Sequence, residues 1–200
     1  MAVTKVSLRQ ECLKKFRNLP KYNKSYNDHR LNQRLQNEIK KLDAKKLLIF
    51  WPLEIEPDIR RTVRYLRRSY ELYLPFMEGD SFKMVPLRLP LERKAFGIYE
   101  AGNTLKKIKN IDVAIVPAVG VDAKARRIGF GKGMYDRFFA SLRKRPKIIF
   151  VQSQHCYTDE DICDDYDISA DLLLTPQALY STARINNVKR NTLRRRRCHA

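Results

Sequence analysis

Apolar residues recur at intervals of three and four along several segments of the chain. Residues 5–18 and residues 25–42 each carry such a stripe, and this spacing predicts an amphipathic helix in both segments. A third helix is predicted to begin near Pro57, because proline suits a first helical turn and the acidic Asp58 suits the positive end of the helix dipole. A fourth helix is predicted over residues 134–142.

Short, continuous apolar runs lie between and after these helices. The run at 47–51 is bounded by lysines and Pro52, and the run at 112–117 is the clearest of the set. Continuous runs of this length are typical of strands that are buried on both faces of a parallel sheet. Further strands are predicted over residues 71–75, 82–87, 147–151 and 171–174. Residues 88–110 are expected to be irregular, and residues 118–132 to form a long loop.

The order of these elements predicts an α/β fold. Two helices come first and strands then alternate with helices or loops, which indicates a three-layer, open, mostly parallel sheet with helices on both faces. Sheets of this Rossmann-like kind bind ligands beyond the carboxyl ends of their strands. A length of 200 residues fits one such domain, which we place at residues 1–180, followed by a basic tail at residues 181–200.

The composition does not point to a membrane protein or a secreted protein. No run of about 18 apolar residues is present to span a bilayer, and residues 1–10 lack the apolar core of a secretory signal. The four cysteines, Cys12, Cys156, Cys163 and Cys198, contain no C-x-x-C pair. We therefore expect a cytoplasmic protein whose cysteines are free thiols.

The chain is strongly basic, with a net charge of +19 from 41 basic and 22 acidic residues. Such a field attracts polyanions, among them nucleic acid, acidic membranes and small polyphosphates. The tail is rich in arginine and has no acid, so we expect it to be disordered and solvated, or to make a loose polyanion contact. A nucleic-acid-binding protein is therefore one hypothesis, although no known nucleic-acid-binding motif is present.

One loop combines glycines with cations. Gly129, Gly131 and Gly133 alternate with other residues, Lys132 lies among them and Arg127 just before them. Glycine lets backbone N–H groups approach a phosphate closely, and the N-terminus of a following helix adds partial positive charge. The spacing matches neither a P-loop nor the G-x-G-x-x-G fingerprint. On pattern alone, the loop is either a phosphate cradle or a glycine-rich turn with solvated basic residues.

A longer motif surrounds this loop. An apolar strand ends in Pro117, Asp122 follows, and residues 127–136 read R-I-G-F-G-K-G-M-Y-D. This pattern resembles the signature of the 5-formyltetrahydrofolate cyclo-ligase family. Weaker similarity to the family covers most of the chain up to about Tyr180, at Lys5 with Arg9, Pro52 with residues 56–58, residues 96–100, and Asp167 with Asp171.

The resemblance implies a fold of the NagB/CoA-transferase-like kind and an ATP- and Mg²⁺-dependent ligase. ATP would phosphorylate the formyl oxygen of 5-formyltetrahydrofolate, and N10 of the same folate would attack the activated carbon. Phosphate would leave, and the product would be 5,10-methenyltetrahydrofolate. The protein then needs no nucleophile of its own, but it must position two anionic substrates and neutralise their charge.

The resemblance also assigns the cations and the nucleotide site. Lys132 and Arg127 are similar to the family's catalytic, phosphate-binding cations; lysine offers a mobile point charge and arginine a planar fork. The full set implied for ATP binding is Lys5, Arg9, Arg127, Gly129, Phe130, Gly131, Lys132, Gly133, Met134, Tyr135 and Asp136. Taken from the sequence alone, Lys5 and Arg9 could equally belong to an ordinary solvated helix face.

The remaining roles concern the folate and the metal. Glu56 resembles the carboxylate that contacts the folate, with Tyr135 and Trp51 as further walls of the substrate site; by its position alone, Trp51 is core or a wall, and Glu56 a capping residue. Asp136 and Asp167 resemble the two carboxylates that hold Mg²⁺, an ion that takes one or two carboxylates beside phosphate oxygens and water. Asp167 could otherwise be part of a solvated acidic loop.

Departures from the family pattern bear on the substrate. Met134 stands where the family usually has tyrosine, and Ile59 stands at a threonine position; Ala101, Val121 and Pro176 also differ. The phosphate and Mg²⁺ residues are intact, so the departures concern the folate more than ATP. A family member that keeps the ATP site with a changed substrate is a further hypothesis. We expect a monomer that acts on small molecules and has no membrane partner.

Overall fold

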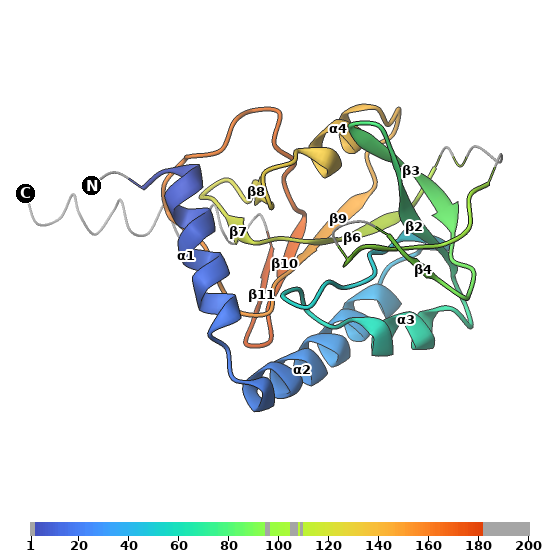
Figure 1. The fold of residues 1–200 in the computed structure, drawn as a ribbon, viewed down its shortest axis with the longest axis horizontal. Helices are drawn as coiled ribbons and strands as arrows, with labels where there is room; N and C mark the ends of the chain where they lie inside the picture. Colours follow the sequence, from blue (N-terminus) through green and yellow to red (C-terminus); the bar gives the residue numbers. More distant parts are fainter. Residues whose placement is uncertain (1–2, 95–96, 105–107, 109, 182–200) are drawn as a thin grey trace, which may run out of the picture.

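A seven-stranded mixed sheet forms the centre of the molecule (Figure 1). The structure, a computed structural model, describes residues 3–94, 97–104, 108 and 110–181. The strand order within these residues is β11-β10-β9-β6-β1-β2-β3. The bounds are β1 Lys46–Leu48, β2 Glu71–Glu78, β3 Ser81–Pro86, β6 Val113–Pro117, β9 Lys147–Val151, β10 Leu172–Leu174 and β11 Leu179–Ser181. The inner five strands are parallel, and the edge strands β3 and β11 are antiparallel to their neighbours.

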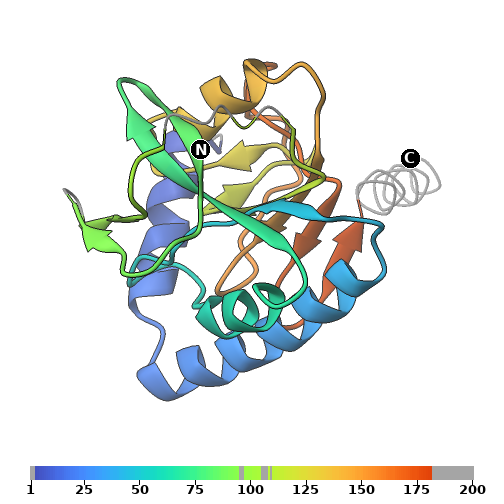
Figure 2. The same cartoon turned by 90° about the vertical axis from the view of Figure 1, so that its right-hand side faces the viewer.

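Helices cover both faces of this sheet, which confirms the predicted three-layer α/β fold. In β6, Val113 and Ile115 face the side covered by α2 (Lys21–Lys40) and α3 (Arg60–Leu66). Ala114 and Val116 face the other side, where Phe138 of α4 (Met134–Ala140) packs against them. The two helical layers are separated by the sheet in Figure 2. Successive residues of a strand point to opposite faces, so a continuous apolar run supplies both cores.

The first helix, α1 (Lys5–Arg17), lies at one side of the sheet. Its apolar stripe, Leu8, Cys12 and Phe16, packs into a smaller cluster with Ile128 and Val119. Thr4 begins the helix with a capping box, in which Thr4 Oγ1 accepts a hydrogen bond from Ser7 N and Ser7 Oγ accepts one from Thr4 N. The helix therefore packs beside the segment that carries the glycine loop.

Several boundaries differ from the predictions. Residues 118–132 are not a plain loop, because β7 (Gly120–Val121) pairs with β8 (Arg127–Ile128). The segment 88–110 contains a second ribbon, β4 (Glu92–Arg93) with β5 (Tyr99–Glu100). These strands are two residues long, which is too short for an alternating pattern to be recognised.

Two helices begin at other residues than predicted. The helix α2 begins at Lys21, directly after Pro20, because its first turn is polar and exposed and leaves no apolar stripe to read. The helix α3 begins at Arg60 and not at Pro57, since Glu56 N donates to Leu53 O in a turn and Asp58 Oδ1 accepts from Arg60 N. The acid of this segment thus precedes the helix and bonds its first residue.

The prediction of free thiols is wrong for two of the four cysteines. Cys12 in α1 and Cys156 after β9 form a disulfide, with their Cα atoms 5.8 Å apart and 144 residues between them in sequence. Cys163 is free and buried, and Cys198 lies outside the described residues. Local spacing cannot reveal a pair that only the packing of α1 against the sheet brings together.

The end of the predicted domain falls at the last strand. Ser181, which we assigned to the tail, closes β11, and the remaining tail residues lie outside the described part of the chain. Across the described residues, no helix has both the length and the apolar character needed to cross a membrane.

Candidate functional site

A cavity of about 660 Å³ opens beyond the carboxyl ends of β1 and β6. Trp51 follows β1, and Pro117 ends β6. The hairpin of β2 and β3 forms a second wall, and the glycine loop with the start of α4 forms a third. This is the edge at which open α/β sheets bind ligands, and its volume is typical of a small-molecule site.

Arg127 projects a buried guanidinium toward this cavity. The residue is 6% exposed, its Nε donates to Pro117 O at 2.9 Å, and its Cζ lies 4.8 Å from the centre of the Tyr135 ring. Burial lowers the pKa of Arg127 from its ordinary value, and Asp136 and Tyr135 oppose that shift. Among the described residues no carboxylate forms an ion pair with Arg127, so its charge is left to interact with a bound anion.

The preceding residue, Arg126, has a different role. It forms a buried ion pair with Asp122, with Nη2 and Oδ2 2.7 Å apart, and it also contacts Asp161. Asp122 is fully buried and additionally accepts from the backbone N of Lys124 and Arg126. This pair ties the turn between β7 and β8 to the acidic segment that follows, and Asp122 therefore holds the loop in place.

Two glycines of the loop have clear structural reasons. A Cβ on Gly129 would lie 2.7 Å from Cζ and 2.8 Å from Nη2 of Arg127, which no real side chain allows. Gly133 caps α4 in the left-handed region, with φ of 59°. Gly129 therefore makes room for the guanidinium, and Gly133 allows the chain to turn into the helix.

Lys132 is exposed and lines the cavity. Its carbonyl accepts a hydrogen bond from Arg137 Nη2 at 2.5 Å, and Arg137 Nε donates to Asp80 O at 2.7 Å. Arg137 thus links the glycine loop to the β2–β3 turn. The cavity also receives Phe130, Gly133, Met134 and Tyr135, as the sequence predicted for a shared site.

The three residues predicted to contact the folate all line this cavity: Glu56, Trp51 and Tyr135. Desolvation raises the pKa of Glu56 to about 7, although the hydrogen bond from Leu53 N and the charge of Arg127 oppose the shift. Desolvation also raises the pKa of Tyr135, whose ring packs edge-on against Phe82, 5.1 Å between centroids. A carboxyl that titrates near neutral pH thus lies beside a buried guanidinium.

Lys5 and Arg9 reach the other side of the glycine loop and do not line the cavity. Arg9 Nε donates to Gly129 O at 2.8 Å, so Arg9 contacts the loop and is not on a merely solvated helix face. Lys5 Nζ bonds to Asp167 and lies 3.3 Å from Asp164 Oδ2. Burial lowers the pKa of Lys5, but the hydrogen bond to Asp167 outweighs it and the net pKa is raised.

The two predicted metal carboxylates come close together. Asp136 Oδ1 accepts from the backbone N of Ile168, the neighbour of Asp167. Asp167 is buried and not part of a solvated loop, and it accepts from Asp164 N and Lys5. The described residues contain no group of three or more His, Cys, Asp or Glu that could hold a metal ion. A pair of aspartates fits Mg²⁺, which takes its other ligands from phosphate and water.

Sequence reasoning missed a wall of the cavity and its link to the loop. The β2–β3 hairpin contributes Met77 and Phe82, and β5 contributes Tyr99. The one local signal was Gly79 followed by Asp80, a turn pair between two apolar runs. Arg137 directly follows the quoted motif, but only the packing of α4 on the hairpin reveals its contacts.

Comparisons with known proteins agree with this geometry. The model of the 5-formyltetrahydrofolate cyclo-ligase family matches residues 1–176. A 5-formyltetrahydrofolate cyclo-ligase of Mycoplasma pneumoniae is 26% identical over 86% of this chain and 99% of its own length. One of Haemophilus influenzae is 23% identical over 78% of this chain and 88% of its own.

Solved structures show the same likeness. The 5,10-methenyltetrahydrofolate synthetase of Aquifex aeolicus superposes with a TM-score of 0.71 and 26% identity, over 89% of this chain and 92% of its own. A 5,10-methenyltetrahydrofolate synthetase of Mycoplasma pneumoniae has a TM-score of 0.67 at 23% identity, over 87% of this chain and 99% of its own. The second likeness concerns the fold.

Proposed function

This chain belongs to the 5-formyltetrahydrofolate cyclo-ligase family, and from that premise we propose that it converts 5-formyltetrahydrofolate to 5,10-methenyltetrahydrofolate with ATP. The formyl oxygen takes the terminal phosphoryl group of ATP, and ADP leaves. N10 of the folate then attacks the formyl carbon, the bond from that carbon to the phosphorylated oxygen breaks, and phosphate departs. Both covalent steps occur between substrates, so the protein acts by position and charge.

The observation that carries this proposal is the buried Arg127 facing the cavity next to Lys132. Phosphoryl transfer spreads negative charge over the transferred group, and fixed cations in a water-poor site stabilise that charge strongly. Arg127 is held by Pro117 O and by the Tyr135 ring, so it does not have to reorganise during the reaction. Lys132 lies on the glycine loop and brings a second cation to the same cavity.

The remaining residues divide between the two substrates. Glu56 and Trp51 line the side of the cavity next to β1, where they would contact the folate. Arg9 and Lys5 support the glycine loop and Asp167 from behind, so we propose that they act on the nucleotide at the rear of the loop. Met134 lines the cavity at the family's usual tyrosine position and offers an apolar surface without a hydroxyl.

We further propose that Asp136 and Asp167 hold Mg²⁺ when ATP is bound. The ion would supply positive charge to the phosphates. Asp136 is the better placed of the two, since Asp167 is already bonded to Lys5, and we expect Lys5 to yield that oxygen on metal binding. We also propose a monomer that acts on small molecules in the cytoplasm.

The test is an absorbance assay for the methenyl product. We expect absorbance to rise when protein, ATP, Mg²⁺ and 5-formyltetrahydrofolate are all present, and to stay flat when any one is omitted. A folded protein that binds ATP but gives no signal with the complete mixture would contradict the folate substrate and favour a changed one.

Variants assign the activity to this site. Lys132→Ala and Asp136→Asn are expected to lower kcat by about 10²-fold or more, with unchanged circular dichroism. Lys41→Ala is the matched control, because Lys41 lies on the surface after α2 and pairs with Glu38. Equal loss of activity in the control would point to a general defect and against the assigned roles.

A further inference from the structure

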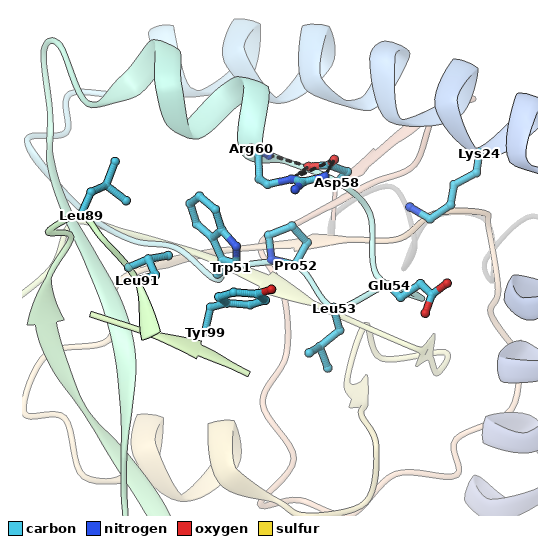
Figure 3. A pocket seen from close by; sticks show the side chains of 10 residues that line it. All are labelled: Lys24, Trp51, Pro52, Leu53, Glu54, Asp58, Arg60, Leu89, Leu91 and Tyr99. Atoms are coloured by element: carbon cyan, nitrogen blue, oxygen red, sulfur yellow. Dashed lines mark hydrogen bonds and ion pairs between the residues drawn. The ribbon is translucent and has the colours of Figure 1, made fainter. Parts of the chain in front are cut away.

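A side compartment adjoins the central cavity at Trp51. Figure 3 shows this compartment: Trp51 and Tyr99 lie side by side, with Leu89 and Leu91 beyond them and Lys24 at the far end. Trp51 and Tyr99 line both the compartment and the central cavity. A ligand in the cavity can therefore extend past these two rings without leaving the protein surface.

The compartment continues into a groove between α2 and α3. Trp51, Lys24, Asp58 and Arg60 line both spaces. Beyond them the walls are polar: Lys21, Ser25, Asp28, His29 and Asn32 from α2, with Arg61 and Arg64 from α3. The path thus runs from an aromatic section into a section rich in charged side chains, which we call the α2–α3 groove.

The charges of the α2–α3 groove do not cancel. Five cations and two carboxylates line it. Asp28 pairs with Lys24 at 2.9 Å, and Asp58 pairs with Arg60 at 2.5 Å. Within the described chain, Lys21, Arg61 and Arg64 form no ion pair with a carboxylate. Three positive charges therefore remain along the far end of the groove, and an exposed basic surface of this kind attracts anions.

Resting on the proposed function, we propose that the α2–α3 groove binds a chain of γ-linked glutamates attached to the folate. A folate is a flat ring system joined through an aromatic linker to a glutamate. The aromatic section at Trp51 and Tyr99 suits the linker, and the cationic section that follows suits carboxylates. Each added glutamate brings one more carboxylate into the groove, where Arg61 and Arg64 can bind it.

The position of the groove favours this occupant over a free phosphate polymer. Its entrance is the wall of the cavity that holds Glu56 and Trp51, the two residues proposed to contact the folate, whereas Lys132 and the glycine loop lie elsewhere in that cavity. A nucleotide bound at the loop would not reach the groove by way of Trp51. The residues of the groove thus belong to the folate end of the site.

Kinetics with two substrates test the proposal. We expect the KM of the triglutamate form of 5-formyltetrahydrofolate to be about tenfold below that of the monoglutamate, and the difference to shrink as salt is raised. The double variant Arg61→Gln, Arg64→Gln should bring the two KM values within about twofold, with kcat and the monoglutamate KM unchanged. The control, Arg67→Gln with Arg68→Gln, removes the same charge just after α3, outside the groove, and should keep the preference.

A binding measurement keeps this test separate from the proposed activity. Trp51 is the single tryptophan of the chain, so its fluorescence reports on the entrance of the groove. We expect γ-linked tetraglutamate, without a folate, to change this fluorescence in the wild type and in the control, but not in the Arg61–Arg64 double variant. Equal responses in both double variants, or equal KM values for the two substrates in the wild type, would overturn the proposal even if the enzyme is active.

Discussion

At the scale of single residues, neighbours along the chain have opposite roles. Arg126 and Arg127 both lie near the start of β8, where successive side chains point to opposite sides. Arg126 therefore meets Asp122 in a buried ion pair, while Arg127 faces the cavity with a backbone carbonyl as its hydrogen-bond partner. Identical side chains thus serve the loop and the site, and only their orientation distinguishes them.

Gly129 is predicted to be as important as the cation it adjoins. In Gly129→Ala the new methyl group would overlap the Arg127 guanidinium, so the guanidinium must leave its place. We expect kcat to fall by about 10²–10³-fold, the usual cost of losing one preorganised charge-stabilising group, with little change in unfolding. Steady-state kinetics measure the effect. Gly102→Ala is the control, because a Cβ there meets nothing within 4 Å; a similar loss in both variants would contradict the steric explanation.

Glu56 should make the stability of the protein depend on pH. Its pKa rises on folding from 4.5 to about 7, so between these values the folded state holds a proton that the unfolded state has lost. Stability therefore falls as pH rises through that window, by about 3 kcal/mol in total. Glu56→Gln cannot titrate. Urea unfolding at about pH 4 and about pH 8 should show the variant gaining that amount relative to the wild type; parallel pH profiles would contradict the shift.

At the scale of elements, α1 serves the site without lining the cavity. It carries Arg9 to Gly129 O and Lys5 to Asp167. Its own attachment consists of a small apolar cluster and the disulfide from Cys12 to Cys156. The helix therefore behaves as a bracket whose position decides how the glycine loop and Asp167 are supported.

The disulfide itself can be tested by counting thiols. In denaturant without reductant, two fewer cysteines should react than after reduction, because Cys12 and Cys156 are joined. Cys12→Ser is expected to lower the free energy of unfolding by about 2–4 kcal/mol, since the bond closes a long loop. Cys198→Ser leaves the pair intact and serves as the control. Equal thiol counts before and after reduction would show that the bond is absent in solution.

At the scale of the whole molecule, the net charge of +19 admits more than one partner. Part of it is concentrated at the site, in Arg127, Lys132 and the α2–α3 groove, where small anions would bind. Another part belongs to the residues after Ser181, which lie beyond the family match that ends at residue 176. The nucleic-acid-binding hypothesis depends on the second part and stays a prediction.

Deleting residues 182–200 separates these two contributions. Because the tail follows both the family match and the last strand, we expect kcat and KM to stay within about twofold of the full chain, while any salt-dependent binding of RNA or DNA weakens. The activity assay and a salt titration of nucleic-acid binding measure both effects. Loss of cyclo-ligase activity on truncation would place the tail in the enzyme, and unchanged tight binding would locate the nucleic-acid surface in the domain.

The sequence by itself determined the layers of the fold and the chemistry of one loop. Buried strands and amphipathic helices are local patterns of apolar residues, so the 112–117 run and the helix after Gly133 could be predicted without a structure. The glycines and cations of residues 127–133 are likewise adjacent, and their resemblance to a family signature named the reaction. Short ribbons such as β7 with β8 carry too few residues to leave such a pattern.

Only the tertiary structure decided which distant residues meet. The bond of Cys12 to Cys156, the contact of Arg137 with Asp80 and the union of Trp51 with the α2–α3 groove all join segments far apart along the chain. The same holds for orientation, because Arg126 and Arg127 read alike in the sequence and differ only once β8 is paired and packed. Long-range contacts arise from the packing of whole elements against the sheet, and no local spacing records them.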